Sequence, residues 1–300
     1  YLQLLKTLAY EIHGGNNNSA TLMLGYLYMQ SGYKMRYGME SSTLYMLYAS
    51  KHHIYNTVAY RLDNDVFYGV EPLPEQMYIC NVAFPKEQDM SLYIKNSPKL
   101  SYREGKTRRI KSDRYPSMDI SITVNKNLLD FFSTYPSSMV NDNFITKWAM
   151  YANTPLAEDV KGNLYPQMRK IIEGKSQTEA VNILLNWVQT GLVYEYDDKV
   201  WGFDRAFFAE ESLSYPYCDC EDRSILFTRL VRDLLDMKCL LVYYPGHLAA
   251  AVNFTDQVCG DYIVQDGHKF IVADPTFIGA PVGKTMASMD NATAKVILLK

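Results

Sequence analysis

The chain has 300 residues, 48% of them hydrophobic, which is enough for a buried core and long enough for two domains. The formal net charge is -3 and neither half forms a basic arm, so the composition argues against nucleic-acid binding. Charged residues interrupt the longest apolar runs, and none approaches the roughly 20 apolar residues that span a bilayer, so no transmembrane segment is predicted.

The sequence leaves open both the cellular location of the protein and the state of its cysteines. The sequence begins Tyr-Leu-Gln-Leu-Leu-Lys, without an initiator methionine and without the order of a signal peptide. A mature product whose leader is absent fits this start, which keeps an exported location (periplasm or cell envelope) open. Five cysteines are an odd number, so we expect at least one free thiol.

Residues 1–62 predict an N-terminal α/β region. Ser19 is the expected N-cap of an amphipathic helix that ends near Gly32. Strands are then expected at residues 33–37, 43–49 and 57–62.

Residues 63–126 predict a β-rich, antiparallel middle region. Short runs rich in Tyr, Val and Ile alternate with turn residues and suggest strands at 65–70, 77–84, 91–94, 99–103 and 119–124. In the last of these, apolar and polar residues alternate, which is typical of a strand with one wet face. The basic run from Lys106 to Arg114 is interpreted as a solvated face rather than a binding patch.

From residue 127 the pattern becomes helical, and residues 127–300 form the third predicted region. Pro155 and Pro166 each suit the first turn of a helix. An amphipathic helix is expected over residues 178–190, stopped by Gly191. A loop rich in tyrosine and aspartate follows.

Cys220 is the first candidate site residue. It stands at the start of a predicted helix, with Asp219 or Cys220 at the cap and acidic residues in the first turn. A helix N-terminus carries about half a positive elementary charge, so we expect a lowered thiol pKa and a nucleophilic thiolate.

His247 and Asp274 complete a candidate triad in the order Cys, His, Asp. His247 follows a Pro-Gly turn and opens a buried strand. Asp274 ends the second arm of a hairpin whose turn is Asp266-Gly267. A carboxylate there can accept the Nδ1–H of the imidazole and orient it.

These three segments together resemble the transglutaminase-like superfamily, and more narrowly its bacterial members. The resemblance rests on Asp-Cys-x-Asp-x-Ser at a helix start, Gly-His at a strand start and Val-x-Asp-Pro-Thr at a later strand end. The spacing is 27 positions from Cys220 to His247 and again from His247 to Asp274. It covers roughly residues 176–280, including a lead-in helix and loop.

The resemblance implies an α+β, papain-like transglutaminase core in which a Cys-bearing helix packs on an antiparallel sheet. It implies Cys220 as nucleophile, His247 as general base and Asp274 as the orienting acid. The expected activity is cysteine-dependent amide-bond chemistry on a peptide or protein substrate through an acyl-enzyme. Hydrolysis is favoured over cross-linking by analogy with bacterial relatives. No metal or cofactor is required.

Several alternatives stay open. Cys218 competes with Cys220 as nucleophile, although the Asp-Cys-Glu-Asp-x-Ser frame fits Cys220. Cys218, Cys220 and His247 could ligate zinc, but a second ligand pair is missing from the sequence. The backbone N–H of Cys220 is one candidate oxyanion donor, and the candidates for the second are Gln189, Trp187 and Trp201. His52, His53 and His268 are expected to be solvated or exposed.

Residues 16–36 resemble residues 220–240 in outline. If Ala20 is set against Ser224, Asn16 falls at the position of Cys220. Residues 1–70 could therefore be a degenerate copy of the same fold that lacks the nucleophile; two unrelated amphipathic helices are the alternative.

The sequence leaves two functional hypotheses. The first is a cysteine peptidase, amidase or acyltransferase. The second is a non-catalytic binding or scaffold protein that retains the fold. The pKa of Cys220 separates them, because a depressed value supports catalysis and a value at or above about 8.5 supports a scaffold.

Overall fold

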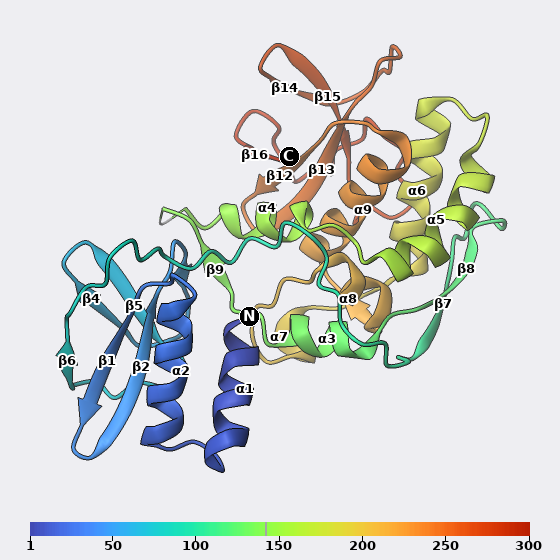
Figure 1. Cartoon of the computed structure of the whole chain (residues 1–300). Coiled ribbons are helices and arrows are strands. Elements are labelled where there is room, and N and C mark those ends of the chain that lie inside the picture. The colour runs from blue at the N-terminus through green and yellow to red at the C-terminus, as the bar shows by residue number, and fades with distance from the viewer. Residues whose placement is uncertain (142) are drawn as a thin grey trace. The chain divides into compact units, whose positions relative to one another are not determined.

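The computed structural model describes residues 1–141 and 143–300, which fold as two compact units. Unit 1 comprises Tyr1–Leu92 and Pro136–Phe144, and unit 2 comprises Tyr93–Tyr135 and Ile145–Lys300. Each unit combines helices with a five-stranded antiparallel sheet (Figure 1). The chain therefore belongs to the α+β class, as the sequence predicts.

The boundary between the units differs from the predicted one at residue 62. The hairpin of β4 (Ala59–Leu62) and β5 (Asp65–Gly69) crosses that boundary, because β5 pairs with β2 (Thr43–Ala49). The first unit therefore extends well into the predicted middle region.

The predicted boundary at residue 126 also differs from the structure. β7 (Thr107–Lys111) and β8 (Asp119–Thr123) belong to unit 2. The indole N–H of Trp187 donates to the carbonyl of Ile110 at 3.1 Å, which ties β7 to the helical part of that unit.

Unit 1 is a helical hairpin packed on a sheet. Its sheet order is β4-β5-β2-β1-β6. Leu47, Ala49 and Phe67 form part of its buried core. The remaining elements are α1 (Leu2–His13), α2 (Asn18–Gln30), β1 (Met35–Glu40), β3 (His53–Ile54), β6 (Tyr78–Cys80) and β9 (Ser138–Met139).

Two details of the predictions for residues 1–126 are corrected. The N-cap of α2 is Asn17 rather than Ser19, because the Asn17 side chain accepts a hydrogen bond from the backbone N–H of Ala20. Residues 91–94 and 99–103 are irregular rather than strands. The expected strand over residues 43–49 is confirmed as β2.

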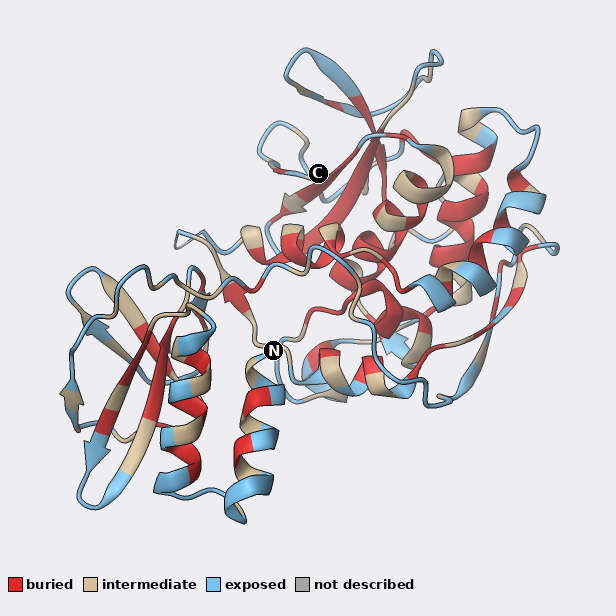
Figure 2. Cartoon of the chain, viewed as in Figure 1, coloured by how far each residue is buried: buried red, intermediate tan, exposed pale blue. Residues whose placement is uncertain are grey.

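Unit 2 contains the predicted Cys-bearing helix α9 (Cys220–Leu235), which packs against β12 (Cys239–Tyr244) and β13 (His247–Asn253). The sheet order is β14-β15-β13-β12-β16, and its central strands are buried (Figure 2). The other elements are α3 (Lys126–Ser133), α4 (Thr146–Asn153), α5 (Glu158–Ile172), α6 (Gln177–Gly191), α7 (Asp197–Val200), α8 (Ala209–Ser214), β10 (Val193–Tyr194), β11 (Tyr217–Cys218), β14 (Tyr262–Gln265), β15 (His268–Ala273) and β16 (Lys295–Leu298).

The helices before the site agree in part with the prediction. α6 has its N-cap at Ser176 and buries the expected apolar face, including Trp187. Pro155 precedes α5, and Pro166 lies inside α5 rather than in a first turn. A single helix, α5, therefore occupies the region in which the two prolines suggested that two helices begin.

The two units share one order of helices and strands. In each, a helix leads into a hairpin (β1–β2 or β12–β13), a second hairpin follows (β4–β5 or β14–β15), and a last strand pairs with the first. Met35 opens β1 and stands 204 positions before Cys239, which opens β12. Thr43 opens β2 and stands the same 204 positions before His247.

The strand register identifies the positions in unit 1 that correspond to the triad. Thr43 corresponds to His247, and counting back 27 positions from each reaches Asn16 and Cys220. Glu71 follows the start of β5 by as many positions as Asp274 follows the start of β15. Unit 1 thus repeats the topology of unit 2 without its thiol or imidazole.

Candidate active site

Cys220 is the first residue of α9, and the local sequence explains why the helix begins there. The Asp219 carboxylate accepts hydrogen bonds from the N–H of Glu221 (3.0 Å) and Asp222 (3.5 Å). Asp222 in turn accepts the N–H of Asp219 at 3.1 Å, which completes a capping box. The cap is therefore Asp219, one of the two predicted residues.

Ser224 and Cys220 attach the start of α9 to the start of β13. The Ser224 hydroxyl donates to the carbonyl of Leu248 at 2.9 Å. The Cys220 thiol has a hydrogen bond with the backbone of the same residue. Because Leu248 follows His247, these contacts bring the thiol to the strand end that carries the imidazole.

His247 and Asp274 are in direct contact. His247 Nε2 and Asp274 Oδ2 are 2.8 Å apart, and only 8% and 4% of the two residues are exposed. The register explains the contact: Ala250 pairs with Ala273, so the next step sets Asp274 against Ala249, and His247 lies two residues away on the same face. The other carboxylate oxygen of Asp274 accepts the N–H of Thr276 at 2.8 Å.

The ring nitrogen that faces Asp274 differs from the expectation. Nε2, not Nδ1, contacts the carboxylate. The imidazole also stacks on Tyr244, with ring centroids 6.2 Å apart. This arrangement leaves Nδ1 as the nitrogen that can accept a proton from a nucleophile.

The electrostatics of Cys220 contradict the expected low pKa. Burial, followed by the nearby Asp219 carboxylate, raises the pKa of the Cys220 thiol well above its usual range. The hydrogen bond with the backbone of Leu248 lowers this pKa but does not outweigh burial. The helix N-terminus is therefore not sufficient to produce a resting thiolate.

Cys218 is a weaker nucleophile candidate than Cys220. It is 2% exposed, and burial raises the pKa of its thiol to about 12. Its Sγ faces the carbonyl of Val193 at 3.8 Å. All five cysteines are free thiols, and Cys220 is partly accessible.

Two of the three upstream oxyanion candidates have their donors engaged elsewhere. The Trp187 indole N–H donates to Ile110. The Gln189 amide donates to the carbonyls of Asp274 (3.0 Å), Phe277 (2.9 Å) and Ala280 (3.0 Å). Gln189 is therefore a support of the loop after β15. Trp201 packs on Arg205, whose guanidinium lies 4.5 Å from its ring centroid.

Arg223 is a site residue that the sequence analysis missed. It is 1% exposed, and its guanidinium donates to the carbonyls of Gln189 (3.1 Å), Leu192 (2.8 Å) and Pro275 (3.4 Å). It thereby joins α9 to the end of α6 and to the residue after Asp274. Its position inside the Asp-Cys-Glu-Asp-Arg-Ser segment was the available indication.

A cluster of carboxylates lies beside the start of α9. Ligand-capable oxygens of Asp197, Asp204 and Glu221 are all within 4.8 Å of one another. The Lys147 ammonium contacts Asp204 at 2.7 Å and Glu221 at 3.7 Å, so a lysine supplies positive charge to the cluster. Burial still raises the pKa of Glu221 to about 8.

The prediction for His52 is corrected, and the prediction of a solvated face for the basic run holds for Lys106, Arg109, Lys111 and Arg114, which are exposed. His52 is buried, and burial followed by the charge of Lys51 lowers its pKa. Within the basic run, Arg108 is partly buried and donates to the carbonyls of Ser212 and Pro216. His53 and His268 are exposed, as expected.

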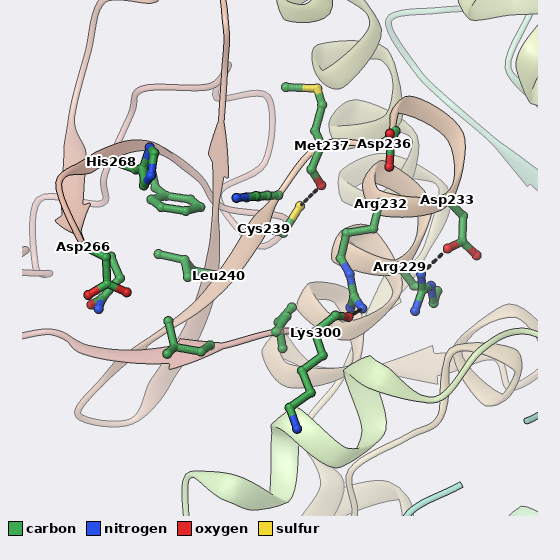
Figure 3. A pocket seen from close by; sticks show the side chains of 15 residues that line it. Arg229, Arg232, Asp233, Asp236, Met237, Cys239, Leu240, Asp266, His268 and Lys300 are labelled. Atoms are coloured by element: carbon green, nitrogen blue, oxygen red, sulfur yellow. Dashed lines mark hydrogen bonds and ion pairs between the residues drawn. The ribbon is translucent and has the colours of Figure 1, made fainter. Parts of the chain in front are cut away.

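A cavity of about 780 Å³ lies away from the triad, at the other end of the sheet (Figure 3). The end of α9, the start of β12 and the β14–β15 turn form its walls, with Arg232, Cys239 and His268 among the lining residues. Cys220, His247 and Asp274 are not among them. The candidate site is thus defined by chemistry rather than by this cavity.

Comparisons of the chain with protein-family models, curated proteins and solved structures found no match. No helix among residues 1–141 and 143–300 has both the length and the apolar character needed to cross a membrane.

Proposed function

We propose that the chain is a cysteine-dependent enzyme acting on amide bonds, with Cys220 as nucleophile, His247 as general base and Asp274 as the residue that orients the base. The observation that carries the proposal is the buried contact between His247 Nε2 and Asp274 Oδ2, at the end of β13 to which Ser224 ties the start of the Cys220 helix. The transglutaminase-like resemblance adds the substrate class, a peptide or protein.

The raised pKa of Cys220 determines how the first step proceeds. The resting thiol is protonated, so His247 removes its proton as the sulfur attacks the substrate carbonyl. The carbonyl π electrons move to oxygen and form a tetrahedral oxyanion. Its collapse expels the amine, which takes the proton from the imidazolium, and leaves a thioester on Cys220.

The second step releases the acyl group. Water attacks the thioester, His247 accepts its proton, and the thiol returns as the carboxylic acid leaves. An amine in place of water would complete acyl transfer. We favour hydrolysis, as for the bacterial proteins that the sequence resembles.

A non-catalytic scaffold is the second candidate function. The observation in its favour is the raised pKa of Cys220, because a thiol without an effective base does not become nucleophilic near neutral pH. The two candidates differ in one property: only the enzyme requires His247 for thiol reactivity.

The test is labelling of the full chain with a limiting dose of iodoacetamide from pH 5 to 10, read by peptide mass spectrometry. The exposed thiols of Cys80 and Cys259 serve as ordinary-thiol standards in the same sample. The variants are Cys220→Ala, Cys218→Ala and His247→Ala.

The enzyme proposal predicts that Cys220 labels at pH 7 in spite of its raised pKa because His247 removes the proton, and that His247→Ala abolishes this labelling while the standards stay unchanged. No labelling of Cys220 at pH 7, or equal labelling in His247→Ala, would favour the scaffold. Labelling of Cys218 in its place would overturn the site assignment.

A further inference from the structure

The tetrahedral oxyanion needs hydrogen-bond donors that are not already engaged. The backbone N–H of Cys220 meets this condition, because the Asp219 cap accepts the N–H of Glu221 and Asp222, and no hydrogen bond of the described residues uses that of Cys220. Gln189 and Trp187 are committed to backbone carbonyls, and Trp201 packs against Arg205, Phe207 and Tyr215. The candidates for the second donor therefore include other residues beside the segment that leads into α9.

Tyr194 is held beside the nucleophile by the backbone. β10 and β11 pair in parallel, with Tyr194 opposite Cys218, two residues before Cys220. The N–H of Glu195 also donates to the carbonyl of Cys218 at 3.3 Å. This short ladder fixes Tyr194 along the segment that leads into α9.

The ring of Tyr194 is fixed as well. The guanidinium of Arg223 lies 5.4 Å from its centroid, and the ring of Tyr196 meets it edge-on at 5.5 Å. Arg223 is itself anchored by three backbone carbonyls. A side chain that its neighbours hold in place can donate a hydrogen bond in the transition state without first having to move.

The hydroxyl of Tyr194 is available as a donor. The side chain is half-buried, and within the described residues its hydroxyl takes part in no hydrogen bond. Burial, followed by the charges of Cys220 and Asp219, raises the pKa of Tyr194, which keeps it a neutral phenol. A neutral phenol is a hydrogen-bond donor.

We propose that the Tyr194 hydroxyl is the second oxyanion donor, which pairs with the backbone N–H of Cys220 to stabilise the tetrahedral intermediate formed on the Cys220 sulfur. The phenol keeps its proton throughout; it donates a hydrogen bond to the oxygen that becomes negative when sulfur adds to the carbonyl. This inference rests on the proposed function.

The experiment compares two reactions of Cys220 in Tyr194→Phe. Acylation by p-nitrophenyl acetate passes through an oxyanion and releases p-nitrophenolate, whereas alkylation by iodoacetamide has no such intermediate. We expect acylation to fall about 100-fold, the usual effect of losing one oxyanion donor, with alkylation unchanged. Tyr196→Phe is the matched control, because it removes the neighbouring hydroxyl and keeps the ring contact.

Three outcomes would overturn the inference. Equal acylation in Tyr194→Phe and the unaltered chain would exclude the oxyanion role and leave the triad proposal intact. Equal losses of acylation and alkylation would show that Tyr194 only supports the site. Absence of His247-dependent acylation in the unaltered chain would overturn the proposed function and this inference together.

Discussion

At the scale of residues, several acidic side chains are buried on α9 and on α8, which packs against it. Glu210, Glu211 and Asp222 are each 1% exposed or less. Burial penalises the ionised form and raises the pKa of each. The same physical effect raises the pKa of the Cys220 thiol.

The raised pKa of Glu210 should make the stability of the protein depend on pH. Burial raises its pKa to about 7 from an ordinary value of 4.5, although it accepts the N–H of Ala157 at 2.7 Å. The folded state therefore keeps a proton that the unfolded state loses, and stability falls as pH rises from about 4.5 to 7. Glu210→Gln keeps an acceptor for Ala157 and removes this ionisation.

We expect the free energy of unfolding of Glu210→Gln to match that of the unaltered chain at pH 4.5 and to exceed it by on the order of 3 kcal/mol at pH 8. Urea denaturation at both pH values measures the difference. The exposed Glu173→Gln is the control and should change neither value. An equal effect at the two pH values would contradict a buried neutral Glu210.

At the scale of elements, the site depends on contacts between segments far apart in sequence. α6, α9 and the loop after β15 meet through two side chains: Arg223 donates to Gln189, Leu192 and Pro275, and Gln189 donates to three carbonyls of that loop. Residue patterns predicted the three elements. They could not predict which side chain joins them, because such contacts leave no period in the sequence.

The variant Gln189→Ala tests the connection between α6 and the loop after β15. The variant leaves three carbonyls and the N–H of Gly279 without their partner, and we expect it to lower the free energy of unfolding by about 2–4 kcal/mol. Hydrogen exchange at residues 276–280 should also become faster than in the unaltered chain. The surface variant Gln167→Ala should change neither quantity. Unchanged exchange in this loop would show that Gln189 does not support it.

At the scale of the whole molecule, one topology occurs twice. Unit 1 has Asn16, Thr43 and Glu71 at the positions of Cys220, His247 and Asp274. Glu71 has no imidazole to orient, and it binds α1 instead, accepting from the Tyr10 hydroxyl at 2.5 Å and pairing with Lys6 at 2.6 Å. The acid of the triad corresponds in unit 1 to a residue that attaches a helix to the sheet.

Glu71→Gln separates the structural role of unit 1 from the chemistry of unit 2. Partial burial opposes ionisation of Glu71, but the hydrogen bonds from Lys6 and Tyr10 outweigh it and lower its pKa. Its stabilisation is therefore present above pH 4.5 and is lost as pH falls. At pH 7 the variant should lose about 1–2 kcal/mol of unfolding free energy and retain full Cys220 labelling.

Thermal unfolding and iodoacetamide labelling of the same samples check both parts of this prediction, with the exposed Glu75→Gln as control. A loss of Cys220 labelling in folded Glu71→Gln would contradict the separation of roles between the units.

The sequence by itself determined the features that depend on neighbouring residues: the cap that starts α9, the Asp-Gly turn between β14 and β15, and the α+β class. It also indicated the similarity between residues 16–36 and 220–240, which the strand register extends to two hairpins. Only the tertiary structure decided that Nε2 of His247 contacts Asp274, that Gln189 supports a loop, and that Cys220 has a raised pKa. These properties depend on burial and on distances between remote segments, and no local pattern of residues encodes either.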